Sequence, residues 1–156
     1  MLSSDRAVVV VVDIQGKLAQ LMHEKERLFS ETARMVRGAA ALGVPVIWME
    51  QNPKGLGPTV SEVAEAMPEG VTAIPKMSFS CCGEIAFLAA LEATGRRQVL
   101  VCGIETHICV YQTSRDLVAR GYEVQVVTDA VSSRKPWNRE VGLKRTEAAG
   151  AALTSV

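Results

Sequence analysis

The chain has 156 residues, of which 48% are hydrophobic and 22% charged, as is typical of one globular domain over residues 1–156. The 17 Lys and Arg residues balance 17 Asp and Glu residues, so the formal net charge is zero. No broad basic surface is therefore available to attract nucleic acid or an anionic membrane, and we predict neither as a partner.

Strands and helices are predicted to alternate along the whole chain. Six segments have the apolar, often β-branched composition of buried strands: 7–13, 44–49, 71–75, 98–102, 123–128 and 151–155. Apolar residues at helical spacing indicate helices over 24–42, 59–67, 84–94, 106–120 and 138–149, with a Gly- and Pro-rich loop over 52–58. This alternation predicts a three-layer α/β/α fold, Rossmann-like, with helices on both faces of a six-stranded parallel sheet.

Three reactive side chains follow the ends of predicted strands, which is where such sheets bind ligands. Asp13 ends the first strand, Lys76 follows the third, and Cys109 lies beyond the fourth, in a helix for which Thr106 is the expected N-cap. The dipole of that helix would favour a thiolate at Cys109. Taken singly, the Asp is a turn former, the Lys a solvated loop charge and the Cys a packing residue. Their convergence on one rim favours a functional site.

Several other classes of protein are disfavoured by missing residues. The four cysteines form no Cys-x-x-Cys pair and two histidines are too few for a three-His zinc site, so we expect reduced thiols, no metal, no cofactor and a cytoplasmic location. The apolar run 7–12 is too short for a signal core or a membrane span, and no basic segment precedes it. A phosphatase of the haloacid dehalogenase type would need an acid where Gln15 stands, and no Gly-x-Gly-x-x-Gly follows the first strand for a dinucleotide.

Four motifs in the right order give the chain a resemblance to the isochorismatase-like cysteine hydrolase superfamily, which includes nicotinamidases. They are Val-Val-Asp-Ile-Gln at 11–15, Pro-Lys-Met-Ser-Phe-Ser at 75–80, Cys-Gly-Ile-Glu-Thr-His-Ile-Cys-Val at 102–110, and the segment 127–134. The resemblance implies that Asp13, Lys76 and Cys109 form a catalytic triad. It further implies a cis peptide bond between Ile104 and Glu105, and an oxyanion hole made by the N–H groups of Glu105 and Cys109.

The chemistry of these residue types agrees with the implied roles. A carboxylate beside a thiol can accept its proton, and an adjacent ammonium offsets the repulsion between the two anions. We therefore predict a hydrolase that cleaves the C–N bond of a small amide through a thioester on Cys109, with a small molecule as substrate. The alternative is a non-catalytic member of the same fold that binds a metabolite or a protein.

Departures from the family narrow the prediction. Nicotinamidases carry an Asp-x-His metal cluster after the second strand, whereas residues 50–58 here contain no His and resemble the metal-free branch of isochorismatase-domain proteins. Isochorismatases proper lack the nucleophilic Cys, so Cys109 argues against their vinyl-ether reaction. Gln51, Phe79 and Trp48 are the candidate substrate-binding residues, although Gln51 could instead satisfy its own loop and the two aromatic residues could be core.

The end of the sequence bears on assembly. Relatives usually continue past the last strand into another helix, and this sequence stops at Val156. Either the sequence is truncated or one face of the sheet is partly bare, and a bare apolar face is expected to be covered by a partner subunit. The resemblance points the same way, and we predict a homo-oligomer, either a dimer or a tetramer.

Overall fold

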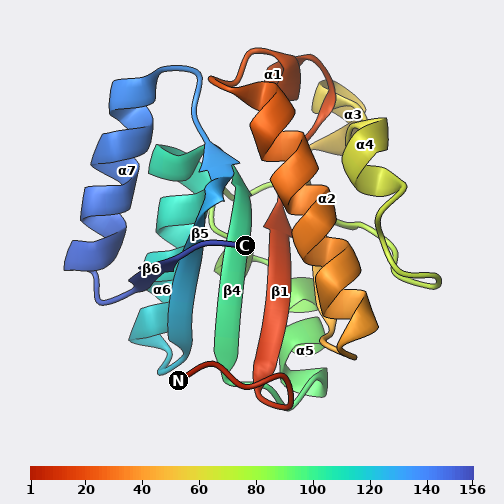
Figure 1. Cartoon of the computed structure of the whole chain (residues 1–156), viewed down its shortest axis with the longest axis vertical. Coiled ribbons are helices and arrows are strands. Elements are labelled where there is room, and N and C mark those ends of the chain that lie inside the picture. Colours follow the sequence, from red (N-terminus) through yellow and green to blue (C-terminus); the bar gives the residue numbers. More distant parts are fainter.

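A six-stranded, all-parallel sheet in the order β3-β2-β1-β4-β5-β6 forms the centre of the computed structural model, which describes residues 1–156 (Figure 1). The strands are β1 (Ala7–Val12), β2 (Val46–Gln51), β3 (Ile74–Lys76), β4 (Gln98–Ile104), β5 (Glu123–Ser132) and β6 (Ala152–Thr154). The helices are α1 (Gly16–Gln20), α2 (Lys25–Ala41), α3 (Pro53–Leu56), α4 (Ser61–Ala64), α5 (Ile85–Ala93), α6 (Tyr111–Ala119) and α7 (Pro136–Ala148).

The central strand β1 explains why the sheet is covered on both sides. Side chains alternate between the faces of a strand, so an unbroken run of valines presents apolar surface to both. Val9 and Val11 belong to the core beneath α2, while Val8, Val10 and Val12 belong to the core beneath α5 and α6. In Figure 1, α2 lies in front of the sheet and α5 and α6 lie behind it. The predicted three-layer α/β fold is confirmed.

The crevice that carries the candidate site lies where the strand order reverses, between β1 and β4. The chain leaves β1 toward α2 on one face and leaves β4 toward α6 on the other, which opens a gap beyond the strand ends. Here the strands approach too closely for a side chain: a Cβ on Gly103 would lie 2.0 Å from the carbonyl oxygen of Val12. Gly103 also has φ +118°, a conformation that favours glycine.

Local structure departs from the sequence expectations at three places. The predicted helix 106–120 divides into a single π-helical turn, Thr106–Val110, and α6. The N-cap position is taken by Glu105, and the buried hydroxyl of Thr106 has no hydrogen-bond partner, so the expected Thr106 cap is wrong. Two short helices, α1 and α3, occupy stretches in which no helix was expected.

One face of the sheet is partly open. An apolar groove of about 310 Å³ lies beside α2, with Val9, Leu100 and Val127 of the sheet and the segment 154–156 among its walls. No helix in the structure is both long and apolar enough to cross a membrane.

Replacing Gly103 by Ala is expected to lower the melting temperature markedly, because the new Cβ would collide with the β1 backbone. Gly95→Ala is the matched control, since Gly95 also has a positive φ of +66° but no atom within 4 Å of a built Cβ. We expect a loss of about 1 kcal/mol for the control and more than about 2 kcal/mol for Gly103→Ala, or roughly 3 °C against 6 °C or more. Equal losses in a thermal melt would contradict the close approach of β1 and β4.

Candidate active site

Asp13 follows β1 directly and lies at the mouth of the crevice. Its backbone is left-handed, with φ +56°, a region that Asp tolerates better than most residues. Its N–H donates to the Met49 carbonyl at 3.3 Å, which ties the turn to β2. The carboxylate is buried, and its Oδ2 faces the ammonium of Lys76.

Lys76 reaches this carboxylate from two strands away. Neighbouring strands lie about 4.8 Å apart, so only a long side chain can pass from β3 over the end of β2 to β1. The ammonium Nζ lies 2.7 Å from Oδ2 of Asp13, and both side chains are almost completely buried. Nζ also donates to Oε1 of Gln51 at 2.6 Å and to the carbonyl oxygens of Phe79 and Ser78 at 2.9 and 3.1 Å. The ammonium is therefore fully coordinated by the protein.

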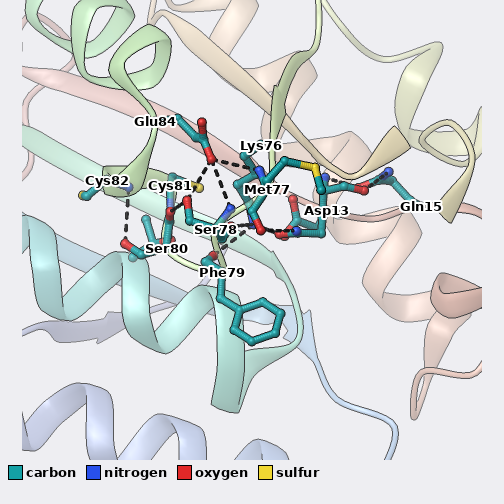
Figure 2. A network of polar contacts seen from close by, with 12 residues as sticks. Asp13, Gln15, Lys76, Met77, Ser78, Phe79, Ser80, Cys81, Cys82 and Glu84 are labelled. Carbon is teal, nitrogen blue, oxygen red and sulfur yellow. Dashed lines mark hydrogen bonds and ion pairs between the residues drawn. The ribbon is translucent and has the colours of Figure 1, made fainter. Parts of the chain in front are cut away.

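Glu84 holds the loop that supplies those two carbonyls. Its Oε1 accepts from the backbone N–H groups of Met77 and Ser78 at 2.8 and 3.1 Å, and from the Ser78 hydroxyl at 2.8 Å (Figure 2). These hydrogen bonds lower the pKa of Glu84, so the carboxylate remains charged and keeps the loop in place. Sequence reasoning missed Glu84, which had been read only as the start of a helix.

Cys109 lies in the π-helical turn, at the edge of the same crevice. Helix α7 packs tightly over this turn, since a Cβ on Gly142 would lie 2.7 Å from the backbone nitrogen of His107. Burial, reinforced by the negative charge of Asp13 and only partly offset by Lys76, raises the pKa of the Cys109 thiol to about 12. Burial and the charge of Asp13 therefore favour the protonated thiol, against the preference for a thiolate that the helix dipole alone would give.

The two charged partners of the thiol also have shifted proton affinities. Burial raises the pKa of Asp13, and the attraction of Lys76 only partly offsets this effect. Burial disfavours the ammonium of Lys76, but the charge of Asp13 together with the neighbouring cysteines outweighs it and raises the pKa of Lys76. A more basic Asp13 beside a protonated Cys109 is a suitable arrangement for passing a proton between them.

A cavity of about 260 Å³ opens onto these groups, and Asp13, Gln51 and Cys109 are among its walls. Most of its wall is apolar, formed by Leu18, Leu56, Phe79, Ile104 and Ile108. Lys76 lies beneath the cavity and does not line it. The cavity has the size and mixed lining of a site for a small molecule.

Glu105 and Arg134 form a second ion pair at the cavity wall. The peptide bond between Ile104 and Glu105 is cis, at the position implied by the family resemblance, and the Glu105 N–H donates to no acceptor of the protein. The buried carboxylate of Glu105 accepts from Nε and the backbone N–H of Arg134, both at 3.1 Å, and Nη2 lies 3.0 Å away. The side chain of Arg134 remains 51% exposed.

The three candidate substrate-binding residues have different positions. Phe79 lines the cavity and is 56% exposed. In Figure 2 its ring points away from the polar network to which its carbonyl belongs. Gln51 borders the cavity, but its amide is engaged on both sides, by Lys76 at Oε1 and by the Met77 carbonyl at Nε2.

Trp48 lies outside the cavity, which corrects the expectation that it lines the pocket. Side chains alternate along β2, and Trp48 shares the face of Val46, in the core beneath α2. Its indole N–H donates to the hydroxyl of Thr59 at 2.7 Å.

Gln15 is a structural residue that the sequence did not reveal. It is completely buried; its Oε1 accepts from the Gln51 N–H at 2.6 Å, and its Nε2 donates to the carbonyls of Gln51 and Gly57 at 3.0 and 2.8 Å. Gln15 thereby joins the end of β1 to the end of β2 and fixes the backbone that carries Gln51. Its only sequence signal is its place in the first motif, two residues after Asp13. No group of three or more His, Cys, Asp or Glu side chains is arranged to hold a metal ion.

Comparisons with known proteins identify relatives over the whole chain. A family model described as the isochorismatase domain matches residues 7–156. A secreted isochorismatase effector of Phytophthora sojae is 39% identical over 153 residues, which cover 96% of this chain and 73% of that protein. Across isochorismatase domain-containing proteins of fish, the chain spans between 50% and 77% of their length.

Solved structures agree with these matches. A structure titled MAR1 ribonuclease from Caenorhabditis elegans has a TM-score of 0.93 and 36% identity, covering 99% of this chain and 79% of that one. The YcaC gene product of Escherichia coli, described as an octameric hydrolase of unknown specificity, has a TM-score of 0.92 and 26% identity, covering 99% of this chain and 77% of that one.

Asp13→Asn is expected to speed the alkylation of Cys109 at pH 7 to 9. The negative charge of Asp13 raises the pKa of the thiol, so its removal leaves Lys76 alone beside the sulfur and lowers that pKa. Each unit of decrease gives roughly tenfold more thiolate. Iodoacetamide labelling followed by peptide mass spectrometry measures the rate at each cysteine separately. Asp5→Asn, at an exposed position near the chain start, is the control, and unchanged labelling of Cys109 in Asp13→Asn would contradict the interaction between the Asp13 charge and the thiol.

Proposed function

The chain belongs to the isochorismatase family, and on this premise we propose that it is a hydrolase that cleaves the C–N bond of a small amide with Cys109 as the nucleophile. The observation that carries the proposal is the buried ion pair of Asp13 and Lys76 at a cavity whose wall includes both Asp13 and Cys109. A buried ion pair is expensive to desolvate, and its position against a thiol is the reason to assign it a chemical role.

The thiol can be activated without any change in the net charge of the buried site. The resting trio holds a carboxylate, an ammonium and a thiol, with a net charge of zero. Transfer of the thiol proton to Asp13 gives a carboxylic acid, the same ammonium and a thiolate, again with a net charge of zero. Lys76 stabilises the anion whether it resides on oxygen or on sulfur, so no uncompensated charge forms in a low-dielectric site.

The chemical steps then use Asp13 twice as a proton carrier. The Cys109 thiolate attacks the amide carbon, and the oxyanion is stabilised by the N–H groups of Glu105 and Cys109, each worth roughly 3 kcal/mol. Asp13 gives its proton to the leaving nitrogen, the C–N bond breaks, and a thioester remains on Cys109. Asp13 next takes a proton from water, which attacks the thioester, and the acid is released as the proton returns to the sulfur.

The size and charge of the cavity support a small molecule. The name of the C. elegans relative raises RNA as an alternative substrate. Binding of RNA depends largely on the neutralisation of phosphates by an excess of positive charge. Here the charged residues at and beneath the cavity are two carboxylates balanced by two cations, which favours a small molecule over a polyanion.

We also propose that the chain forms a homo-oligomer and acts in the cytoplasm. The apolar groove beside α2 and the octameric state of the E. coli relative support assembly, with a dimer or a tetramer as the expected form. The four unpaired cysteines favour a reducing compartment, although the P. sojae relative is named as a secreted protein.

Cys109→Ala is expected to abolish ammonia release in a screen of small amides while the circular dichroism spectrum and melting temperature stay close to those of the parent. The matched control is Cys82→Ala, which removes a buried thiol outside the cavity and is expected to retain activity within about twofold. Turnover by Cys109→Ala would exclude the sulfur as nucleophile. A broad amide panel without ammonia release, together with a tight protein or metabolite partner, would favour the non-catalytic alternative.

A further inference from the structure

Four charged side chains lie at or just beneath the cavity, and they form two ion pairs. Asp13 is paired with Lys76 beneath the cavity, and Glu105 is paired with Arg134 at its wall. The first pair belongs to the proposed chemistry. The second has no role in the steps above, because only the backbone N–H of Glu105 takes part in them.

In the Glu105–Arg134 pair both carboxylate oxygens are hydrogen-bonded, whereas the guanidinium keeps unused donors. Both carboxylate oxygens of Glu105 are occupied by Arg134 and the side chain is 5% exposed. A guanidinium has five N–H donors, and Arg134 directs only Nε and Nη2 at Glu105, with no other acceptor in the protein. The cavity wall therefore offers unused donors whose positive charge is already compensated.

The other polar groups of the cavity carry no uncompensated negative charge for a cation. Gln51 uses its side-chain oxygen on Lys76, and the charge of Asp13 is balanced by the same ammonium. A cationic ligand would meet Arg134 at the wall without an uncompensated carboxylate to pair with. An anionic ligand would gain from Arg134 but would be repelled by Glu105, and it would lose its hydration against five apolar side chains.

We propose that the substrate is an uncharged amide with an apolar body and one hydrogen-bond acceptor directed at Arg134, and that the Glu105–Arg134 pair sets this preference for neutral molecules. The inference rests on the proposed amide hydrolysis and adds the substrate class to it. Arg134 binds the acceptor, while Glu105 cancels the charge that would otherwise select a carboxylate.

The test uses three amides of nearly equal length that differ in charge: 4-oxopentanamide, which is neutral, succinamate, which is anionic, and 4-aminobutanamide, which is cationic. For the parent protein, kcat/KM is expected to be about tenfold higher for the neutral amide than for either charged one. Glu105→Gln leaves Arg134 uncompensated and should raise the succinamate-to-neutral ratio about tenfold. Arg134→Gln should instead raise the ratio for 4-aminobutanamide. Each ratio is taken within one variant, so a general loss of activity cancels.

Two control variants separate this effect from nonspecific changes. Arg134→Lys keeps the charge and should keep the parent ratios. Glu123→Gln makes the same charge change as Glu105→Gln at an exposed ion pair with Arg6, at the opposite end of the sheet, and should leave the ratios unchanged. Should Glu105→Gln fail to fold, Arg134→Gln carries the test, because the Arg134 side chain is half exposed.

A second readout needs no turnover. Iodoacetamide and iodoacetate are a neutral and an anionic alkylating agent of similar size, and their rates at Cys109 are compared with their rates at a free thiol. The parent is expected to disfavour iodoacetate about tenfold, and Glu105→Gln to remove most of that bias. A parent that prefers succinamate or iodoacetate, or variants with unchanged ratios in both assays, would overturn the inference. If the inference fails but the neutral amide is hydrolysed, the proposed hydrolase activity still stands. If no amide is hydrolysed but the alkylation rates show the expected bias, only the hydrolase proposal is rejected.

Discussion

The ion pair between Lys76 and Asp13 spans the sheet from β3 to β1, across the end of β2, and both side chains are almost completely buried. Two desolvated charges are stable there only if their remaining hydrogen-bonding capacity is met. All the hydrogen-bond donors of the ammonium are used, on Asp13, Gln51 and two loop carbonyls. The carboxylate faces that ammonium through one oxygen, Oδ2. The cation is therefore fixed, while the anion remains able to exchange a proton with Cys109.

Much of the surrounding structure serves to keep that arrangement rigid. Gln15 clamps the backbone at Gln51, and Glu84 clamps the loop whose carbonyls face Lys76. Both are polar side chains that bond to backbone rather than to any ligand. A reactive group must be held within a fraction of an ångström, and residues one step removed from it provide that precision. The sequence does not predict this role for either residue, because Gln and Glu at strand and helix ends more often contact solvent.

The fold was predictable because it depends on patterns that repeat along the chain. The valine run of β1 predicts burial on both faces, and alternation of strands and helices predicts the parallel sheet. That Asp13, Lys76 and Cys109 would meet followed from their places after strand ends. The raised pKa of Cys109 did not, because it depends on how deeply the fold buries the thiol and on the nearby charge of Asp13. Trp48 was misplaced for a similar reason: the face on which a strand residue lies is set by register, which the sequence specifies only through neighbouring strands.

A nucleophile with a raised pKa changes how the proposed reaction must proceed. A thiolate that persisted at rest would need its own counter-charge in an apolar cavity, and the structure supplies one cation for two potential anions. The negative charge therefore has to move rather than accumulate, from the carboxylate to the sulfur and then to the oxyanion of the substrate. Lys76 lies beside the first two positions and the unpaired N–H of Glu105 is available for the third. A neutral substrate leaves that sequence undisturbed at every step, whereas a charged one would add an ion whose charge the two balanced pairs of the cavity do not compensate.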